Sequence, residues 1–96
     1  MNPVSDQTKF HYVYILRSKK TSDWYTGCTS DLRRRFKQHN TGKSNSWTQG
    51  RAPFELIYYE AYRHSKDAYA REKQIKSGPG KRYIRERLKR FLSLTG

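Results

Sequence analysis

Two charged side chains lie on helix faces that should be apolar. Arg35 projects from or beside the inward face of a helix predicted over residues 31–41. Glu72 lies on the inward stripe that Ala68 and Ile75 define in a later helix. Charges directed toward a core are costly unless they are paired, bind a metal ion or face a cleft. The pattern leaves three interpretations: an Arg35–Glu72 ion pair, side chains whose charged ends extend to water, or a phosphate-binding arginine beside a metal-binding glutamate.

The acidic residues limit what kind of metal centre can exist. The chain has eight Asp and Glu residues, without a D-x-D or E-x-x-E cluster, so a two-metal centre with several carboxylates is not expected. One carboxylate is enough for Mg²⁺ when water and substrate phosphate oxygens complete its shell, and Glu72 would suffice. His11, His39 and His64 lack metal-ligand spacing, which argues against a histidine zinc site.

Tyrosines recur in the two apolar segments that precede the predicted helix. Tyr12 and Tyr14 lie in the first segment and Tyr25 in the second, where they either fill a core or face a cleft. A phenol with a pKa of about 10 is a poor base, and a nearby Arg35 or divalent cation would lower that pKa. His39, one turn beyond Arg35, could reach a phosphate or serve the helix end alone.

Three strands and three helices can position these residues. Segments rich in β-branched and aromatic residues predict strands over residues 11–16, 24–27 and 54–62. The first strand has apolar residues on both alternations, which predicts cover on both faces, and the first two strands form a hairpin ending at Gly27. The expected class is α+β, a small antiparallel sheet with helices packed on it.

Capping residues mark where the helices begin and end. Ser30 is the expected N-cap of the first helix, which stops at Gly42, and Ser65 is the expected N-cap of the second. The segment Ser-Gly-Pro-Gly at 77–80 ends the second helix. A third, basic helix is predicted over residues 81–92.

Composition favours a folded domain with a polyanionic partner. The chain has 96 residues, 15% of them aromatic, and its 21 Lys and Arg residues leave a net charge of +13. Nucleic acid is the first partner to expect, and an anionic membrane surface or acidic protein comes next. The residues expected to contact nucleic acid are Arg33, Arg34, Lys37, Lys43, Arg51, Lys81, Arg82, Arg85 and Lys89, with Trp47 stacking on an unpaired base.

The sequence also indicates a compartment. It has no apolar stretch long enough to span a membrane, no signal-peptide core, and Cys28 as its single cysteine. We therefore expect a cytoplasmic protein with no membrane partner and no intrachain disulfide.

Several motifs together resemble the GIY-YIG nuclease superfamily. Tyr12-Val13-Tyr14 and Tyr25-Thr26-Gly27 resemble the two halves of the motif that names it. The following "DLRRRFKQHNTGK" is similar to the family's first helix, and "AREKQIK" to the helix that carries its glutamate. The likeness extends over about residues 10–92 and is greatest to small stand-alone GIY-YIG proteins of bacteria.

This resemblance implies a fold and an activity. It implies a three-stranded antiparallel sheet flanked by helices in one domain, residues 10–93, after a flexible segment 1–9. It also implies metal-dependent hydrolysis of phosphodiester bonds in DNA, with RNA not excluded and a role in DNA repair or processing. A separate protein would select the target. The alternative is a non-catalytic basic module that keeps the fold and binds nucleic acid.

The resemblance further assigns roles to individual residues. Tyr14 would activate the attacking water with Tyr25 as its partner, Arg35 would stabilise charge on the phosphate, and His39 would assist. Glu72 would hold one Mg²⁺ or Mn²⁺ ion, and Gly27 would let the chain pass close to the site. Tyr12 stands where the family has glycine, and either lines the same cleft or packs.

Overall fold

The three strands form one antiparallel sheet in the computed structural model, which describes residues 9–42 and 48–95. Strand β1 (His11–Ser18) is central, with β2 (Trp24–Thr29) on one side and β3 (Phe54–Tyr62) on the other. Both pairings are antiparallel, so the α+β class and the three-stranded sheet are confirmed. The second strand does not end at Gly27, because the ladder with β1 continues to Thr29.

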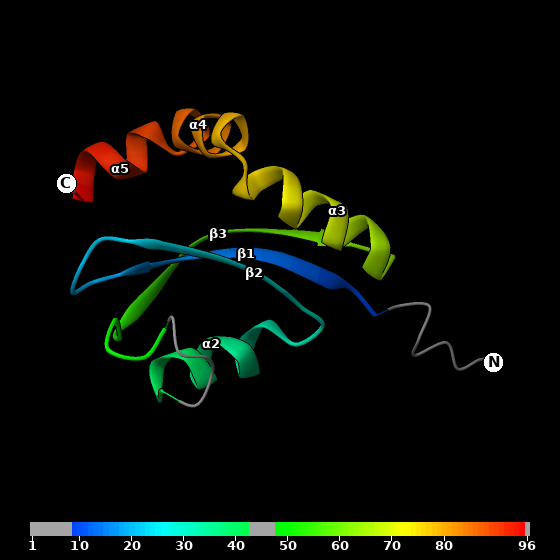
Figure 1. Cartoon of the computed structure of the whole chain (residues 1–96), viewed down its shortest axis with the longest axis horizontal. Helices are drawn as coiled ribbons and strands as arrows, with labels where there is room; N and C mark the ends of the chain where they lie inside the picture. Colours follow the sequence, from blue (N-terminus) through cyan, green and yellow to red (C-terminus); the bar gives the residue numbers. More distant parts are fainter. Residues whose placement is uncertain (1–8, 43–47, 96) are drawn as a thin grey trace.

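Helices cover both faces of this sheet. Helix α2 (Leu32–Asn40) lies on one face, and α3 (Ser65–Lys76), α4 (Gly78–Arg87) and α5 (Lys89–Thr95) lie on the other (Figure 1). In the part of the chain that is described, no helix has the length and apolar character needed to cross a membrane.

Alternation along β1 supplies a separate core to each face. Val13 and Ile15 pack against α3 and α4, where Ile84 belongs to the same buried cluster. Tyr14 and Leu16 point to the other face, where they join a cluster beneath α2. The prediction that both faces of this strand are covered is therefore confirmed.

Two helices begin one residue away from the predicted caps. Asp31, rather than Ser30, caps α2, and its carboxylate accepts a hydrogen bond from the Arg34 amide at 3.2 Å. The Thr29 hydroxyl accepts a hydrogen bond from the Asp31 amide at 3.0 Å, so a turn occupies the preceding residues. His64, rather than Ser65, caps α3, because its ring accepts a hydrogen bond from a backbone amide.

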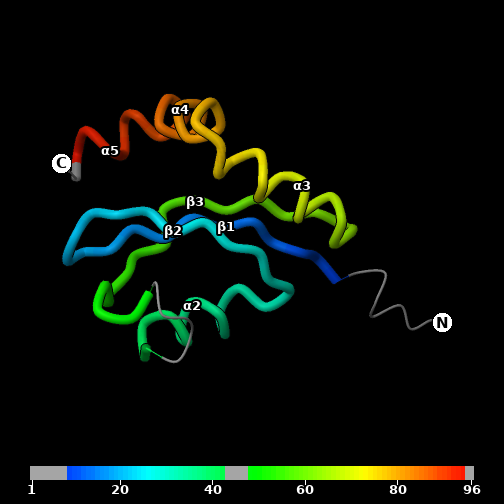
Figure 2. The backbone as a smooth tube through the Cα atoms, in the orientation of Figure 1, coloured from blue at the N-terminus to red at the C-terminus, as the bar shows by residue number. Residues whose placement is uncertain are grey.

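The C-terminal region contains two helices where one was predicted. The Ser-Gly-Pro-Gly segment ends α3, as expected, but it also supplies the first turn of α4, with Ser77 as N-cap. A break at Leu88 then separates α4 from α5. Figure 2 shows the chain continuing through α3, α4 and α5 along one side of the sheet toward the β1–β2 hairpin.

Gly80 allows α4 to start directly against the last turn of α3. It is buried, and a Cβ at this position would overlap the carbonyl oxygen of Gln74 and lie 2.7 Å from the Cα of Ile75. Neither backbone can give way without moving a helix, so the junction depends on the absence of a side chain.

We predict that Gly80→Ala lowers the free energy of unfolding by roughly 1–3 kcal/mol, because the new methyl group overpacks the α3–α4 junction. Gly78→Ala is the matched control, since its Cβ would have only an Arg82 side-chain atom at 3.7 Å. Denaturant unfolding monitored by circular dichroism measures both variants. Equal stability of the two variants would contradict the packing described for Gly80.

Candidate active site

The ring of Tyr14 lies beneath Gly27. The two residues are direct partners in the β1–β2 ladder, and Tyr14 is 1% exposed. A Cβ at Gly27 would overlap the hydroxyl end of the Tyr14 ring, so only glycine permits this approach. A side chain from the central strand thereby reaches under the edge strand of the sheet.

His39 holds the Tyr14 hydroxyl from the last turn of α2. The Tyr14 Oη atom and His39 Nε2 are 2.9 Å apart in a buried hydrogen bond. His39 is 0% exposed, and its ring centroid lies 4.9 Å from that of Tyr25 and 6.2 Å from that of Phe54. His39 therefore contacts Tyr14 in this structure, and its reach to a phosphate stays a prediction.

Burial sets the protonation of this pair. Burial, together with the positive charge of Arg35, lowers the pKa of His39 to about 4. Burial also raises the pKa of Tyr14, with a further increase from Tyr25 and Glu72 that Arg35 only partly opposes. Arg35 thus lowers the pKa of the Tyr14 phenol, as predicted, but burial raises that pKa by more. At neutral pH the imidazole is neutral and the phenol is protonated.

Tyr25 and Tyr12 have different surroundings. Tyr25 is half-buried beside Tyr14, at a ring-centroid distance of 6.3 Å, and also contacts His39. Tyr12 projects to the same sheet face as Tyr14, but its ring packs edge-on against Tyr59 at 5.9 Å, in a groove on the β3 side of α2. Tyr12 therefore packs apart from the Tyr14–His39 pair.

Arg35 lies on the β2 side of α2. It is half-buried, and within residues 9–42 and 48–95 its guanidinium makes no side-chain hydrogen bond or ion pair. With Arg34 and Gln38 it lines an open hollow that extends to Thr29 at the end of β2. A hollow with two arginines beside the sheet edge is suited to an anion.

Glu72 approaches the same edge from the opposite face. Its carboxylate is 19% exposed and pairs with Lys76, one turn further along α3, at 2.9 Å. The charge of Glu72 acts on Tyr14 and also on Cys28, the residue after Gly27. Because α2 and α3 cover different faces, the interpretation of an Arg35–Glu72 ion pair is wrong: in the described parts of the chain, Lys76 is the ion-pair partner of Glu72.

The ligand set at Glu72 limits which metal ion would fit. Among the described residues, no group of three or more His, Cys, Asp and Glu side chains could hold a metal ion together. A closed zinc-type site therefore does not fit. A single half-buried carboxylate, whose partner Lys76 is exposed and can move away, fits a hard cation that keeps most of its water ligands.

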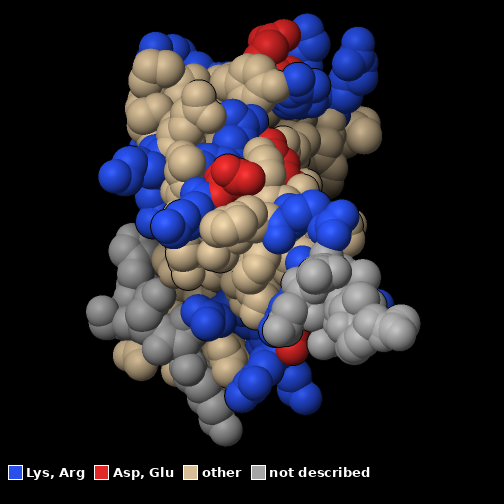
Figure 3. Space-filling model, turned by 90° about the vertical axis from the view of Figure 1, so that its right-hand side faces the viewer, with Lys and Arg blue, Asp and Glu red and all other residues tan. Residues whose placement is uncertain are grey.

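The predicted nucleic-acid contacts do not form one surface. Arg33, Arg34 and Lys37 are exposed on α2, whereas Lys81 and Arg82 are exposed on α4, across the sheet. Figure 3 shows Lys and Arg side chains spread over the viewed face, with few acidic ones between them.

The other predicted contacts lie elsewhere. Arg51 is half-buried, and its Nε atom is 3.6 Å from the carboxylate of Asp23 near the β1–β2 turn. Lys43 and Trp47 lie outside the described residues, as does most of the predicted flexible segment 1–9.

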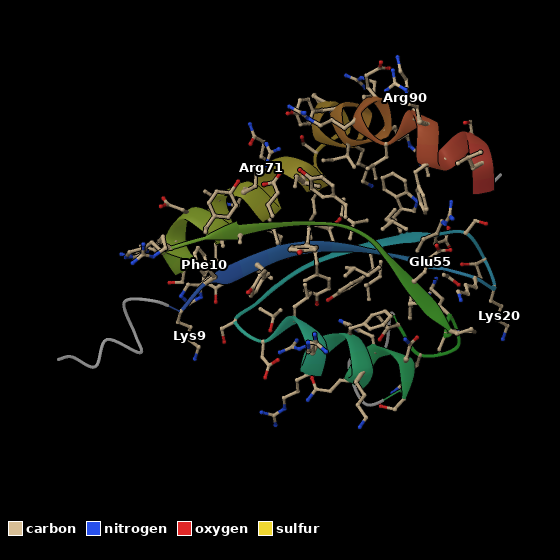
Figure 4. The ribbon with its side chains drawn as sticks, turned by 180° about the vertical axis from the view of Figure 1, so that it is seen from behind. Lys9, Phe10, Lys20, Glu55, Arg71 and Arg90 are labelled. Carbon is tan, nitrogen blue, oxygen red and sulfur yellow. The ribbon has the colours of Figure 1, made fainter. Side chains whose placement is uncertain are left out.

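A half-buried ion pair next to Glu72 was not foreseen from the sequence. Arg71 donates two hydrogen bonds of 2.9 Å to Glu60 on β3, and the hydroxyls of Tyr58 and Tyr62 donate to the same carboxylate. Burial would raise the pKa of Glu60, but these hydrogen bonds, with those from Arg71 foremost, lower it to about 2. Figure 4 shows Arg71 on α3 above the sheet, so this network fixes the helical turn that carries Glu72. The sequence did contain a signal for this network, because the polar groups at positions 58, 60 and 62 alternate along one strand and so share one face of the sheet.

Comparison with known proteins identifies relatives of the whole chain. A family model described as "GIY-YIG catalytic domain" matches residues 10–91. The UPF0213 protein HQ_3675A of Haloquadratum walsbyi is 40% identical over 78 residues, which cover 81% of each chain. The UPF0213 protein YazA of Bacillus subtilis is 37% identical over 84 residues, which cover 84% of each chain. A solution NMR structure of the UPF0213 protein BH0048 from Bacillus halodurans is 40% identical, covers 78% of this chain and 81% of that chain, and has a TM-score of 0.49.

We predict that stability falls as the pH drops from about 6.5 to 4. The unfolded chain binds a proton at His39 throughout this window and the folded chain does not, so up to about 3 kcal/mol of unfolding free energy is lost. His39→Gln should flatten the profile within this window, while the loss due to Glu60 occurs at lower pH, between about 4.5 and 2. Urea unfolding at successive pH values measures both profiles. An unchanged slope in His39→Gln would contradict the assignment.

Proposed function

The chain belongs to the GIY-YIG family, and on this premise we propose that it is a divalent-metal-dependent nuclease that hydrolyses phosphodiester bonds in DNA. The family implies a nuclease and a nucleic-acid substrate. The observation that carries the finer proposal is the Tyr14–His39 hydrogen bond under Gly27, with Arg35 and Glu72 acting on the same phenol from opposite faces. A role in DNA repair or processing and a separate targeting protein belong to the same proposal.

Tyr14 and His39 act together on the attacking water. In this proposal neutral His39 carries its proton on Nδ1, so that Nε2 accepts a hydrogen bond from the Tyr14 hydroxyl, which keeps an oxygen lone pair for a water molecule. As the water attacks phosphorus, Tyr14 takes the water proton while its own proton passes to His39 Nε2. The low pKa of His39 disfavours this transfer at rest, and negative charge that develops on the phosphate favours it.

Arg35 binds the phosphate on which this charge develops. Its guanidinium is half-buried, lines the hollow beside β2, and has five N–H donors for non-bridging oxygens. Burial strengthens the interaction, because a partly desolvated site screens charge less than water does. Tyr25 packs against both rings of the Tyr14–His39 pair and keeps them in place.

Glu72 is the proposed ligand of one Mg²⁺ or Mn²⁺ ion. A bound divalent cation supplies positive charge that stabilises the leaving oxygen and lowers the pKa of a nearby phenol. Glu72 must then release Lys76, whose exposed side chain can turn into solvent.

A cleavage assay with labelled duplex, single-stranded, branched and RNA substrates tests this function. We predict cleavage that requires Mg²⁺ or Mn²⁺ and that falls by at least about 100-fold in Glu72→Gln, because a transition-state charge loses its partner. Glu86→Gln is the matched control, since Glu86 is exposed on α4 and, among the described residues, forms an ion pair with Lys89 alone. Wild-type protein that cleaves no substrate, or equal cleavage by the two variants, would remove the support for a nuclease.

The second candidate is a nucleic-acid-binding module without turnover. The net charge of +13 and the protonated state of Tyr14 at neutral pH favour it. Binding that needs no metal ion and survives Glu72→Gln, in the absence of cleavage, would select this alternative. Absence of salt-dependent binding would reject it.

A further inference from the structure

A cleft of about 620 Å³ lies between the sheet and helices α4 and α5. Residues of all three strands line it near the β1–β2 turn, and α4 and α5 line the opposite wall. Figure 4 shows Glu55 and Lys20 at this end of the sheet, on the side of α5. The volume is in the range of sites that hold a small ligand, so the cleft admits a nucleotide.

The walls of the cleft are positively charged. Glu55 is the only acidic residue among the described lining residues, and it pairs with Arg17 at 3.1 Å. Arg17 is largely buried, and its guanidinium also lies over the ring of Phe91. Lys19, Arg85 and Lys89 are exposed around this neutralised floor. The cleft therefore has an excess of positive charge that an anion can neutralise.

Trp24 adds an aromatic surface to the cleft. Its ring is half-buried, and the guanidinium of Arg85 lies 4.5 Å from the ring centroid. The ring also packs against the buried cluster that contains Val13 and Ile15, so an unpaired base would take the place of the Arg85 guanidinium on the ring, and the displaced cation would meet a phosphate. An acidic peptide would neutralise the cations as well, but its carboxylates would leave the Trp24–Arg85 pair unused. The chemistry therefore favours a nucleic-acid strand.

The cleft and the Tyr14 site share the edge strand β2. Trp24 and Cys28 point to the same face of this strand, four residues or roughly 13 Å apart. Cys28 lies within the electrostatic influence of Glu72. The cleft lies on the α4–α5 face of the sheet and Arg35 on the α2 face, so a nucleic-acid strand that crosses the edge of the sheet at β2 can reach both.

We propose that this cleft binds a single-stranded stretch of the nucleic-acid substrate, a few nucleotides from the bond that is cut, with a base on Trp24 and phosphates on Arg85 and Lys89. The position relative to the cut bond rests on the proposed nuclease function, whereas the binding itself does not. The preferred substrate is then a junction between duplex and single strand.

Fluorescence of Trp24 tests this proposal directly. The full chain carries Glu72→Gln to prevent cleavage and Trp47→Phe, which leaves Trp24 as the single tryptophan. Titration with a short oligothymidylate should quench Trp24, and an abasic oligomer of the same length should not. The quenching midpoint measured at several salt concentrations also gives the salt dependence of binding.

Two double variants in this background distinguish binding by the cations of the cleft from binding by the overall positive charge of the protein. Arg85→Gln with Lys89→Gln should weaken binding and reduce the slope of log affinity against log salt by about 1.4, at about 0.7 for each lost phosphate contact. Arg90→Gln with Lys66→Gln removes the same charge from exposed residues outside the cleft lining and should keep both quenching and slope. Circular dichroism checks that both variants are folded.

The possible failures can be told apart. Equal affinities of the two double variants, equal quenching by the abasic oligomer, or stronger quenching by polyglutamate would each overturn the cleft proposal. A cleft-dependent affinity in a protein whose wild type never cleaves would support the cleft and reject the nuclease. Cleavage that depends on Glu72, together with binding that the cleft variants do not change, would support the nuclease and reject the cleft.

Discussion

The close contact between the Tyr14 ring and Gly27 is the constraint on which the site depends. Without a side chain at Gly27, a phenol from the central strand passes under the edge strand. His39 at the end of α2 then meets the hydroxyl in a buried hydrogen bond. Burial keeps the imidazole of His39 neutral and the phenol of Tyr14 protonated. The packing that positions Tyr14 therefore also sets its protonation state.

The charges around this pair come from opposite faces of a thin sheet. Arg35 belongs to α2 and Glu72 to α3, and a three-stranded sheet brings both helices within electrostatic reach of one edge. The network of Glu60 and Arg71 anchors α3, with hydrogen bonds that offset the cost of burying the two charges. This network on the α3 face of the sheet thus holds in place the helix that carries Glu72, the proposed metal ligand.

The sequence predicts the sheet and its hairpin better than the arrangement of the candidate site residues in space. Alternation identifies β1 as covered on both faces, and misplaced charges single out Arg35 and Glu72. Helical periodicity shows that a residue faces the sheet, but it does not show which face of the sheet its helix covers. The sequence therefore could not decide against an ion pair between Arg35 and Glu72, which the structure does not form. His39 and Tyr14 are 25 positions apart in the sequence, so local sequence patterns could not predict the contact between them.

Paramagnetic line broadening by Mn²⁺ tests most directly whether one edge of the sheet gathers these groups around a cation. The account predicts that NMR signals of Cys28 and Tyr14 broaden first as Mn²⁺ is added to the protein, and that Glu72→Gln abolishes this selective effect. Broadening centred on Glu55 or Glu60, or broadening of Cys28 and Tyr14 that persists in Glu72→Gln, would contradict it.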